Sequence, residues 1–334
     1  MTRRFPLPDA KSSLADAKSS LADRIEQVRR TARRLGRGAG NSGRGLGSRA
    51  GDGGRRLCRR LNRTYHRRAG RRTHDPGGID VIREAWDLLV VLDACRYDTF
   101  TEHCELAGTL RRRRSRGSHT SEFLWGNFAE RRLHDTVYVT ANVQPYVYRE
   151  ALDLHHVEHV WLDGYDEEVG TVPPEAVTDA ALAAAERFPD KRLVVHYLQP
   201  HYPFLEGPTF EHGTMEFWDA VARGEIDADL DQLRAWYGRN LERAMPAVER
   251  LLASFGGRAV VTADHGTALG ERARPIPVRE WGHPWGIYTE PLVAVPWLVR
   301  EGNRRRRVES DPPTDNRNYD EKVVKDRLNT LGYV

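Results

Sequence analysis

The 334-residue sequence predicts an α/β protein, a three-layer α/β/α sandwich around a mostly parallel central sheet. Two observations carry this prediction. Short, continuous apolar runs of strand length recur along residues 76–302, and longer segments with helical periodicity lie between them. Apolar runs without polar alternation are typical of strands buried on both faces, which is how parallel sheets are packed.

Five apolar runs predict the strands, and all five are expected to be parallel. They are Trp86–Asp93, Thr136–Ala141, Arg192–Leu198, Arg258–Asp264 and Leu292–Val299. Helices are predicted over Pro174–Phe188 and over Leu230–Phe255, which ends at a Gly-Gly pair. A short helix near the C-terminus is expected to end near Leu331.

Charge divides the chain into unlike parts. Residues 1–75 hold 21 Lys and Arg against six Asp and Glu, a net charge of +15, and the remainder holds 31 against 42, a net charge of −11. We therefore expect a basic, mostly disordered arm over residues 1–75 and a globular domain over residues 76–302. A polar C-terminal segment with a short helix follows over residues 303–334.

The basic arm begins with an internal repeat, because Asp9–Ala15 and Asp16–Ala22 both have the sequence DAKSSLA. Apolar residues spaced by three and four from Ala10 to Leu35 indicate a short amphipathic helix, a weak coiled coil or a partly helical solvated tail. Residues 36–54 are rich in Gly and Ser and are expected to be flexible. The arginine-dense residues 55–72 could bind nucleic acid or an anionic membrane surface, or simply keep the domain soluble.

Several classes of protein are excluded by composition. No run of 18 apolar residues exists, so no transmembrane helix is expected. The twin arginine Arg3-Arg4 has no apolar region behind it, which argues against an export signal. Three cysteines without zinc-knuckle spacing do not make a disulfide scaffold. The expected location is therefore cytoplasmic.

Side chains suited to metal binding or acid–base chemistry gather where the predicted strands end. They are Asp93, His196, His201, Asp264, His265 and His283. In open α/β sheets, functional groups collect at the carboxyl ends of the strands. Aspartate and histidine suit zinc or manganese, and oxygen-rich sites suit calcium or magnesium. The alternative is that the Asp-His pair only caps a helix.

A nucleophile is expected among hydroxyl side chains beside Gly117. Ser118, Thr120 and Ser121 stand at a predicted junction between a loop and a helix. The amide groups at the start of a helix favour anions, and a hydroxyl there can bind a metal ion. An ordinary N-cap would explain the same residues, and spacing alone leaves both interpretations open.

Together these segments resemble the alkaline phosphatase superfamily, and within it the sulfatase-like hydrolases and transferases. The resemblance covers about Trp86–Val299 and has its motifs in the family's order: VVLDACRYD, the Gly117–Thr120 loop, HYLQPHYPF, ADHGTALGE and GHP. A weaker similarity is the terminal LNTLGYV. The resemblance implies that residues 76–302 form a sulfatase-like catalytic domain.

The resemblance also implies a role for each matching residue. A first metal ion would be held by Asp93, Thr120, Asp264 and His265. In family members with a threonine nucleophile, the threonine stands in a Gly-x-x-Thr loop, which selects Thr120 here. His201 and His283 would act in catalysis and face a second metal ion or the substrate. His196 and Ser118 are expected to contact the substrate.

Two departures from the family pattern refine these expectations. Sulfatases make formylglycine from a Cys-x-Pro-x-Arg motif, but none of the three cysteines fits, and His119 stands where the cysteine is expected. A metal-activated hydroxyl is therefore the expected nucleophile, which favours phosphate esters over sulfate esters. In addition, Asp93 is followed by Ala94 rather than by a second aspartate, which favours zinc or manganese, with calcium or magnesium as alternatives.

The expected function is a metal-dependent hydrolase of phosphate or sulfate esters, acting on an anionic small molecule or glycan ester. Thr120 would attack the ester and His201 or His283 would protonate or hold the leaving oxygen. One alternative is a phosphotransferase resembling the phosphoethanolamine or glycerophosphate transferases, acting on a cell-surface glycan or lipid precursor. Another is a non-catalytic scaffold anchored by its basic arm.

Overall fold

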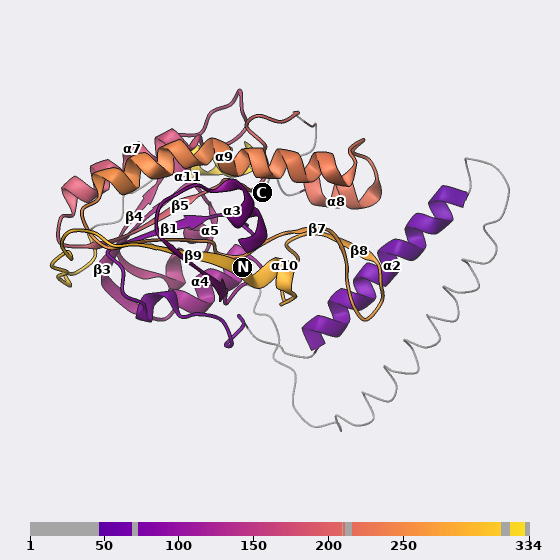
Figure 1. Cartoon of the computed structure of the whole chain (residues 1–334), viewed down its shortest axis with the longest axis horizontal. Helices are drawn as coiled ribbons and strands as arrows, with labels where there is room; N and C mark the ends of the chain where they lie inside the picture. Colours follow the sequence, from indigo (N-terminus) through magenta and orange to yellow (C-terminus); the bar gives the residue numbers. More distant parts are fainter. Residues whose placement is uncertain (1–46, 69–72, 209, 211–215, 315–320, 331–334) are drawn as a thin grey trace, which may run out of the picture.

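The computed structural model describes residues 47–68, 73–208, 210, 216–314 and 321–330. Its centre is a seven-stranded sheet in the order β2-β9-β6-β1-β5-β3-β4 (Figure 1). These strands are β1 (Leu88–Leu92), β2 (Thr109–Arg114), β3 (Arg132–Thr140), β4 (Asp153–His159), β5 (Arg192–Tyr197), β6 (Ala259–Thr262) and β9 (Ala294–Arg300). A separate hairpin pairs β7 (Ala268–Arg272) with β8 (Arg279–Gly282). The predicted helix between Ala10 and Leu35 lies outside the described residues.

Helices cover both faces of the sheet, which confirms the predicted three-layer α/β/α sandwich. One face carries α3 (Tyr97–His103), α6 (Val160–Asp163), α7 (Pro174–Arg187), α9 (Leu230–Ser254) and α11 (Glu321–Thr330). The other face carries α4 (Thr120–Asn127) and the 3₁₀ helix η1 (Val81–Arg83). The remaining short elements are α5 (Gln144–Val147), η2 (Arg149–Ala151), α8 (Phe217–Arg223) and α10 (Glu290–Val293).

The central strand β1 shows why the apolar runs predicted strands. All five of its residues are buried. Leu88 and Val90 belong to the apolar cluster under α7 and α9, whereas Leu89 and Val91 belong to the cluster under α4. Because successive side chains of a strand point to opposite faces, a strand covered on both faces needs an apolar residue at every position.

The last predicted strand runs in the opposite direction to the prediction. β9 pairs antiparallel with β6 and with β2, so the sheet is mixed, although its other strands are parallel. After β6 the chain forms the β7–β8 hairpin and α10 at the carboxyl edge of the sheet, and it re-enters from that edge. A parallel strand would require a crossover to the opposite edge. An apolar run indicates burial and does not indicate direction.

The histidines at positions 155 and 159 lie on a strand. Both belong to β4, which pairs parallel with β3 at the edge of the sheet. Four residues span about 13 Å along a strand, compared with about 6 Å along a helix. The two rings are therefore too far apart to share a metal ion.

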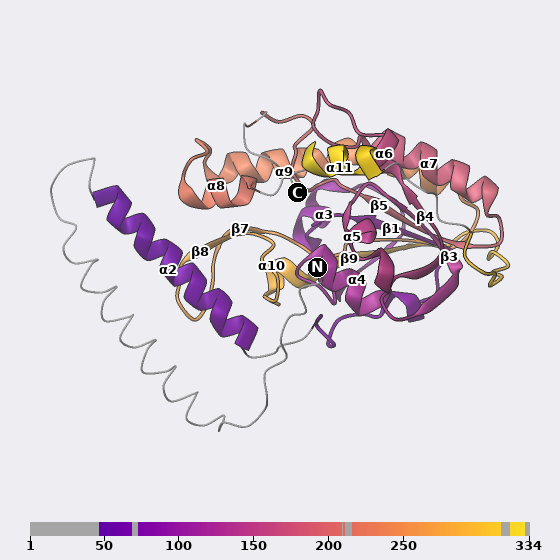
Figure 2. The same cartoon turned by 180° about the vertical axis from the view of Figure 1, so that it is seen from behind.

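The basic stretch forms a long helix, α2 (Gly47–Arg68), which the sequence analysis did not predict. It lies along the β7–β8 hairpin at one end of the molecule (Figures 1 and 2). The buried Asn62 exchanges two hydrogen bonds with the backbone of Ile276, and Arg63 forms an ion pair with Glu280 at 2.8 Å. Among the described residues, no helix is both long and apolar enough to cross a bilayer.

The polar segment after residue 301 runs across the amino-terminal edge of the sheet. Arg306 donates to the carbonyl oxygens of Ala185 and Phe188 at the end of α7. The buried Lys191 forms an ion pair with Asp311 at 2.5 Å. The edge opposite the strand ends is thus closed by hydrogen bonds and charge pairs.

A loop with the sequence QPHYPF is attached to α9 by one buried side chain. Asn240 places its Nδ2 atom 3.1 Å from the Pro200 oxygen and 2.9 Å from the His201 oxygen. Its Oδ1 atom accepts from the Leu205 N–H at 3.0 Å. Asn240 therefore fixes the backbone on both sides of His201.

We expect Asn240→Ala to lower the free energy of unfolding by about 3 kcal/mol, since buried backbone groups would lose their partners. Urea unfolding followed by circular dichroism measures this change. The exposed neighbour Arg239 provides the control, because Arg239→Ala should change stability by less than about 0.5 kcal/mol. Equal losses in the two variants would contradict this role of Asn240.

Candidate metal and catalytic site

The register of three strands brings the predicted ligands to one place. Val91 of β1 pairs with His196 of β5 on one side and with Thr262 of β6 on the other. Asp93 follows β1 by one residue and Asp264 follows β6 by two. The three strands thus end nearly level, and their functional side chains meet at the carboxyl edge of the sheet.

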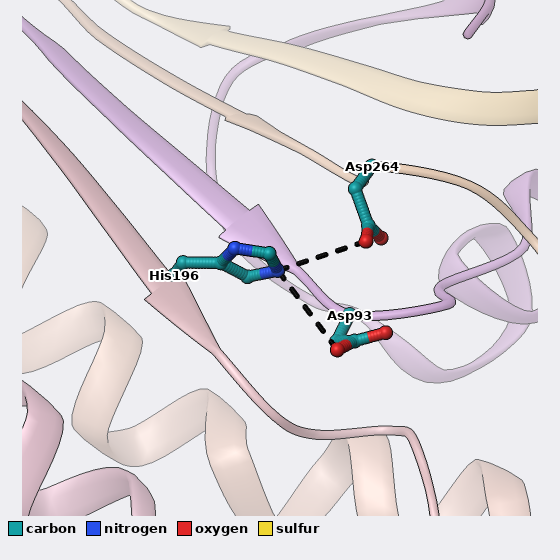
Figure 3. Close-up of side chains that lie close together, drawn as sticks. All are labelled: Asp93, His196 and Asp264. Carbon is teal, nitrogen blue, oxygen red and sulfur yellow. Dashed lines mark ion pairs between the residues drawn. The ribbon is translucent and has the colours of Figure 1, made fainter. Parts of the chain in front are cut away.

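Two carboxylates and one imidazole form the centre of this site (Figure 3). The His196 Nε2 atom lies 4.0 Å from Asp93 Oδ2 and 3.7 Å from Asp264 Oδ2. One ligand atom from each side chain lies within 4.8 Å of the other two, and all three residues are buried. The His265 Nε2 atom completes the group, 3.7 Å from Asp93 Oδ1 and 3.3 Å from Asp264 Oδ2.

The predicted nucleophile is in direct contact with this centre. Thr120 is the first residue of α4, and its hydroxyl donates to Asp264 Oδ2 at 2.7 Å. The Thr120 Oγ1 atom also lies 3.3 Å from His265 Nε2. His119 caps the helix by accepting the Ser121 N–H on its Nδ1 atom, so the two interpretations of this loop are compatible.

Two further histidines face each other beside the centre. The Nε2 atoms of His201 and His283 are 2.9 Å apart. His201 places Nδ1 at 2.6 Å from the Tyr202 carbonyl, and His265 places Nδ1 at 2.8 Å from the Gly266 carbonyl. A carbonyl oxygen can only accept, so the Nδ1 atoms of His201 and His265 carry the proton and their Nε2 atoms present a lone pair. This tautomer is the one that metal-binding histidines adopt.

Burial separates the protonation behaviour of the two carboxyl groups. Burial, and then repulsion from Asp264, raises the pKa of Asp93 well above its usual range. Burial also acts to raise the pKa of Asp264. In that case His265 and His196, the Ala94 N–H and the Thr120 hydroxyl outweigh it and hold the pKa below its usual value. Asp264 is therefore the carboxylate that stays ionised in metal-free protein.

Burial keeps four histidines of the site neutral. It lowers the pKa of His196, His201 and His119 to about 4 each, and it lowers the pKa of His283 well below its usual value. At neutral pH these imidazoles therefore offer lone pairs or N–H groups and carry no positive charge. Neutral imidazole is the form that binds a metal ion.

Unsatisfied buried atoms test whether the site fits a divalent cation. Asp93 Oδ1, His196 Nε2 and His283 Nδ1 are buried and have no hydrogen-bond partner among the described residues. Such atoms cost free energy unless something else binds them. Two carboxylates with neutral imidazoles are suitable donors for zinc or manganese. The residues present therefore fit a metal ion held by Asp93, His196 and Asp264, with His265 and Thr120 beside it.

The structure shows what surrounds the two predicted substrate contacts, which stay predictions. His196, expected to contact the substrate, lies in the group of buried ligand atoms. Ser118 is buried in the loop, where its hydroxyl donates to Glu122 Oε2 at 2.7 Å and accepts the Ile287 N–H at 3.2 Å. These bonds show how Ser118 holds the loop together, and its substrate contact stays a prediction.

Several supporting residues were missed by the sequence analysis. Asn142 donates to Asp93 Oδ2 at 2.6 Å, and the Tyr138 hydroxyl lies 3.0 Å from His196 Nδ1. Ala94 has a φ of 61°, which directs its N–H to Asp264 Oδ1 at 3.0 Å. A polar residue just after a predicted strand could have indicated Asn142. Nothing in the sequence marks Ala94 or Tyr138, because their roles depend on strand pairing and backbone geometry.

A three-layer α/β fold with a buried Asp-His-Asp group at the carboxyl edge of its mostly parallel sheet is the class that these observations define. Comparisons of sequence and of structure find partial similarity to known proteins. In sequence, the chain is 32% identical over 132 residues to the 2,3-bisphosphoglycerate-independent phosphoglycerate mutase of Synechococcus elongatus. That match covers 40% of this chain and 19% of the mutase. No protein family model matches the chain.

Solved structures with a similar chain path include two bacterial proteins. The lipooligosaccharide phosphoethanolamine transferase A of Neisseria meningitidis is 10% identical with a TM-score of 0.44, covering 65% of this chain and 47% of that one. A protein in the alkaline phosphatase superfamily from Vibrio parahaemolyticus is 12% identical with a TM-score of 0.41, covering 70% and 64%. The chain therefore spans less than half of the transferase.

In metal-free protein, the Asp93 carboxyl contributes stability that is lost as pH rises above the ordinary carboxyl range of about 4, because the folded protein retains a proton that the unfolded chain releases. The buried histidines with lowered pKa act in the opposite direction below about pH 6.5, in wild type and in Asp93→Asn alike. We therefore expect the stability of wild type minus that of Asp93→Asn to fall as pH rises. Urea unfolding in chelator from about pH 4 to about pH 8 measures it.

Added zinc should make wild type more stable than Asp93→Asn, because Asn supplies no anionic ligand. The exposed Asp231 on α9 provides the control, since Asp231→Asn should follow the wild-type profile. An unchanged pH slope in Asp93→Asn would refute this account of the carboxyl pair.

Proposed function

We propose that this chain is a metal-dependent phosphoester hydrolase that uses Thr120 as its nucleophile. The observation that carries the proposal is the position of the Thr120 hydroxyl. It lies at the start of a helix, hydrogen-bonded to an ionised buried carboxylate and next to a histidine lone pair. Unsatisfied buried ligand atoms beside it supply the case for a metal ion.

The chain's own residues define a two-step transfer. The Thr120 proton leaves along the hydrogen bond to Asp264, and the Thr120 oxygen forms a bond to phosphorus while the bond to the leaving oxygen breaks. A bound divalent cation would lower the pKa of the hydroxyl and offset charge on the phosphoryl oxygens. Water then attacks the phosphothreonine and restores the hydroxyl. An alcohol in place of water would make the same chemistry a phosphotransfer.

The lowered pKa values of the two facing histidines refine their role. At neutral pH His201 and His283 hold no extra proton to give to a leaving group, because burial keeps both imidazoles neutral. Their Nε2 atoms, 2.9 Å apart, are better suited to binding a cation or to orienting the leaving oxygen. We therefore favour positioning over general acid catalysis for this pair.

A scaffold without catalytic activity is the competing proposal. A site with no function would have little reason to retain buried, unpaired ligand atoms such as Asp93 Oδ1 and His196 Nε2, because each reduces stability. Replacing such groups by apolar side chains is often neutral or stabilising. Retention of the set supports the enzyme.

We expect Thr120→Ala to lower turnover of an aryl phosphate by roughly 10³-fold or more, since the attacking oxygen is removed. Thr120→Ser should retain measurable turnover. Ser121→Ala is the matched control, because this neighbouring hydroxyl contacts His119 and not the carboxylates. Full activity in Thr120→Ala would exclude it as the nucleophile. Mass spectrometry of the trapped wild-type enzyme should find a phosphoryl group on Thr120.

Removal of metal should abolish the same turnover, and zinc or manganese should restore it. A panel of aryl phosphate, phosphodiester, phosphonate and sulfate, each with and without an added alcohol, identifies the ester class and separates hydrolysis from transfer. Phosphate esters are expected to react fastest. A protein that binds no divalent metal and turns over none of these esters would favour the scaffold.

A further inference from the structure

The helix α2 is docked on the body through polar groups. Asn62 and Arg63 bind the β7–β8 hairpin, and the Arg59 guanidinium donates to the Ala222 carbonyl at 3.0 Å. Among the described residues, none of the four apolar clusters contains a side chain of α2. The apolar side chains of this helix therefore take no part in holding it in place.

These apolar side chains form a stripe on the helix surface. Leu57, Leu61 and Tyr65 follow one another at intervals of four residues, so they lie on one side over about 12 Å. Leu57 is 53% exposed and Tyr65 is 40% exposed. Neighbouring exposed apolar groups of this size are typical of a surface that binds a partner or a membrane.

Arginines run beside the stripe. Arg56 and Arg60 are exposed, and neither forms an ion pair with any residue that the structure describes. The whole helix has eight arginines and one aspartate. At its C-terminal end the Arg67 guanidinium lies 5.6 Å from the ring of Trp285, which is itself 41% exposed. Arg60, three residues after Leu57, thus lies next to the apolar stripe.

We propose that this side of α2, together with Trp285, docks on the surface of an anionic lipid bilayer. An amphipathic helix can lie in the interface with its apolar side chains at the acyl boundary while its arginines pair with lipid phosphates. Tryptophan also favours this interface. Both the apolar stripe and the arginines would then contact the bilayer.

Two other occupants satisfy only part of the surface. A nucleic acid would pair with the arginines but would leave Leu57 and Tyr65 in water, since no base-reading motif accompanies them. A second copy docked through the same stripe would cover the apolar groups but would bring two rows of unpaired arginines together. The bilayer is the occupant that accommodates both kinds of side chain.

Docking would place the catalytic edge near the bilayer. Trp285 follows His283 by two residues, and α2 lies along the hairpin that leads to His283 (Figures 1 and 2). This arrangement favours esters in lipid headgroups as substrates, a consequence that rests on the proposed function. The docking itself does not depend on catalysis and is tested separately.

The test is sedimentation of the full chain with vesicles, comparing phosphatidylglycerol mixed with phosphatidylcholine against phosphatidylcholine alone. Wild type is expected to bind the anionic vesicles. Arg56→Gln combined with Arg60→Gln should weaken binding about 30-fold, since each arginine near the surface contributes about fivefold. Leu57→Ser should weaken it about tenfold through lost burial.

A matched control removes two arginines from the opposite end of the domain. Arg83 precedes β1 and Arg187 ends α7, and both are exposed at the amino-terminal edge of the sheet. Arg83→Gln combined with Arg187→Gln should leave vesicle binding unchanged. Circular dichroism and turnover of a soluble aryl phosphate should be unchanged in every variant. Sedimentation still decides the docking if the protein turns over no ester.

Four outcomes would overturn the docking. They are absence of vesicle binding, equal binding to both vesicle types, binding that Leu57→Ser leaves unchanged, and tighter binding to duplex DNA or RNA than to vesicles. A dimer in sedimentation equilibrium that Leu57→Ser dissociates would instead assign the stripe to a second copy.

Discussion

The structure depends on the burial of two carboxyl groups, Asp93 and Asp264, at the ends of two adjacent strands. Two like charges in a medium of low polarity are costly unless donors and cations surround them. The chain supplies the Asn142 amide, the Ala94 N–H and the Thr120 hydroxyl, and burial lowers the pKa of the nearby His196 imidazole. This set is incomplete for two carboxylates, and a divalent cation could complete it.

The connections at the carboxyl edge follow from this requirement. The chain leaves β6 beside Asp264, forms the β7–β8 hairpin and delivers His283 before it returns as β9. It leaves β5 beside His196 and forms the loop that Asn240 holds, which delivers His201. Both histidines therefore come from insertions at the same edge. The reversed direction of β9 is a geometric consequence of a hairpin that begins and ends beside the site.

The sequence predicts the parts of this arrangement that depend on local chemistry. Apolar runs identified β1, β3, β5, β6 and β9, and helical periodicity identified α7 and α9 to within a residue or two. The predicted direction of β9 was wrong because the burial of a strand does not determine its direction. The helix α2 was missed because it docks through polar contacts and so has no apolar side chains facing the core. The ligand position of His196 depends on strand register, which one sequence does not reveal.

Charge in the site argues for an order of binding. Among the described residues, no lysine or arginine side chain bonds to Asp93 or Asp264. Arg96, three residues after Asp93, forms ion pairs with Asp98 and Glu271 instead. The site alone therefore repels an anionic ester, and a bound cation reverses the local field. The arginines of α2 act only over the roughly 8 Å that physiological salt allows. They could hold the proposed anionic surface nearby, whereas the reacting group of the proposed ester would bind only after the metal ion.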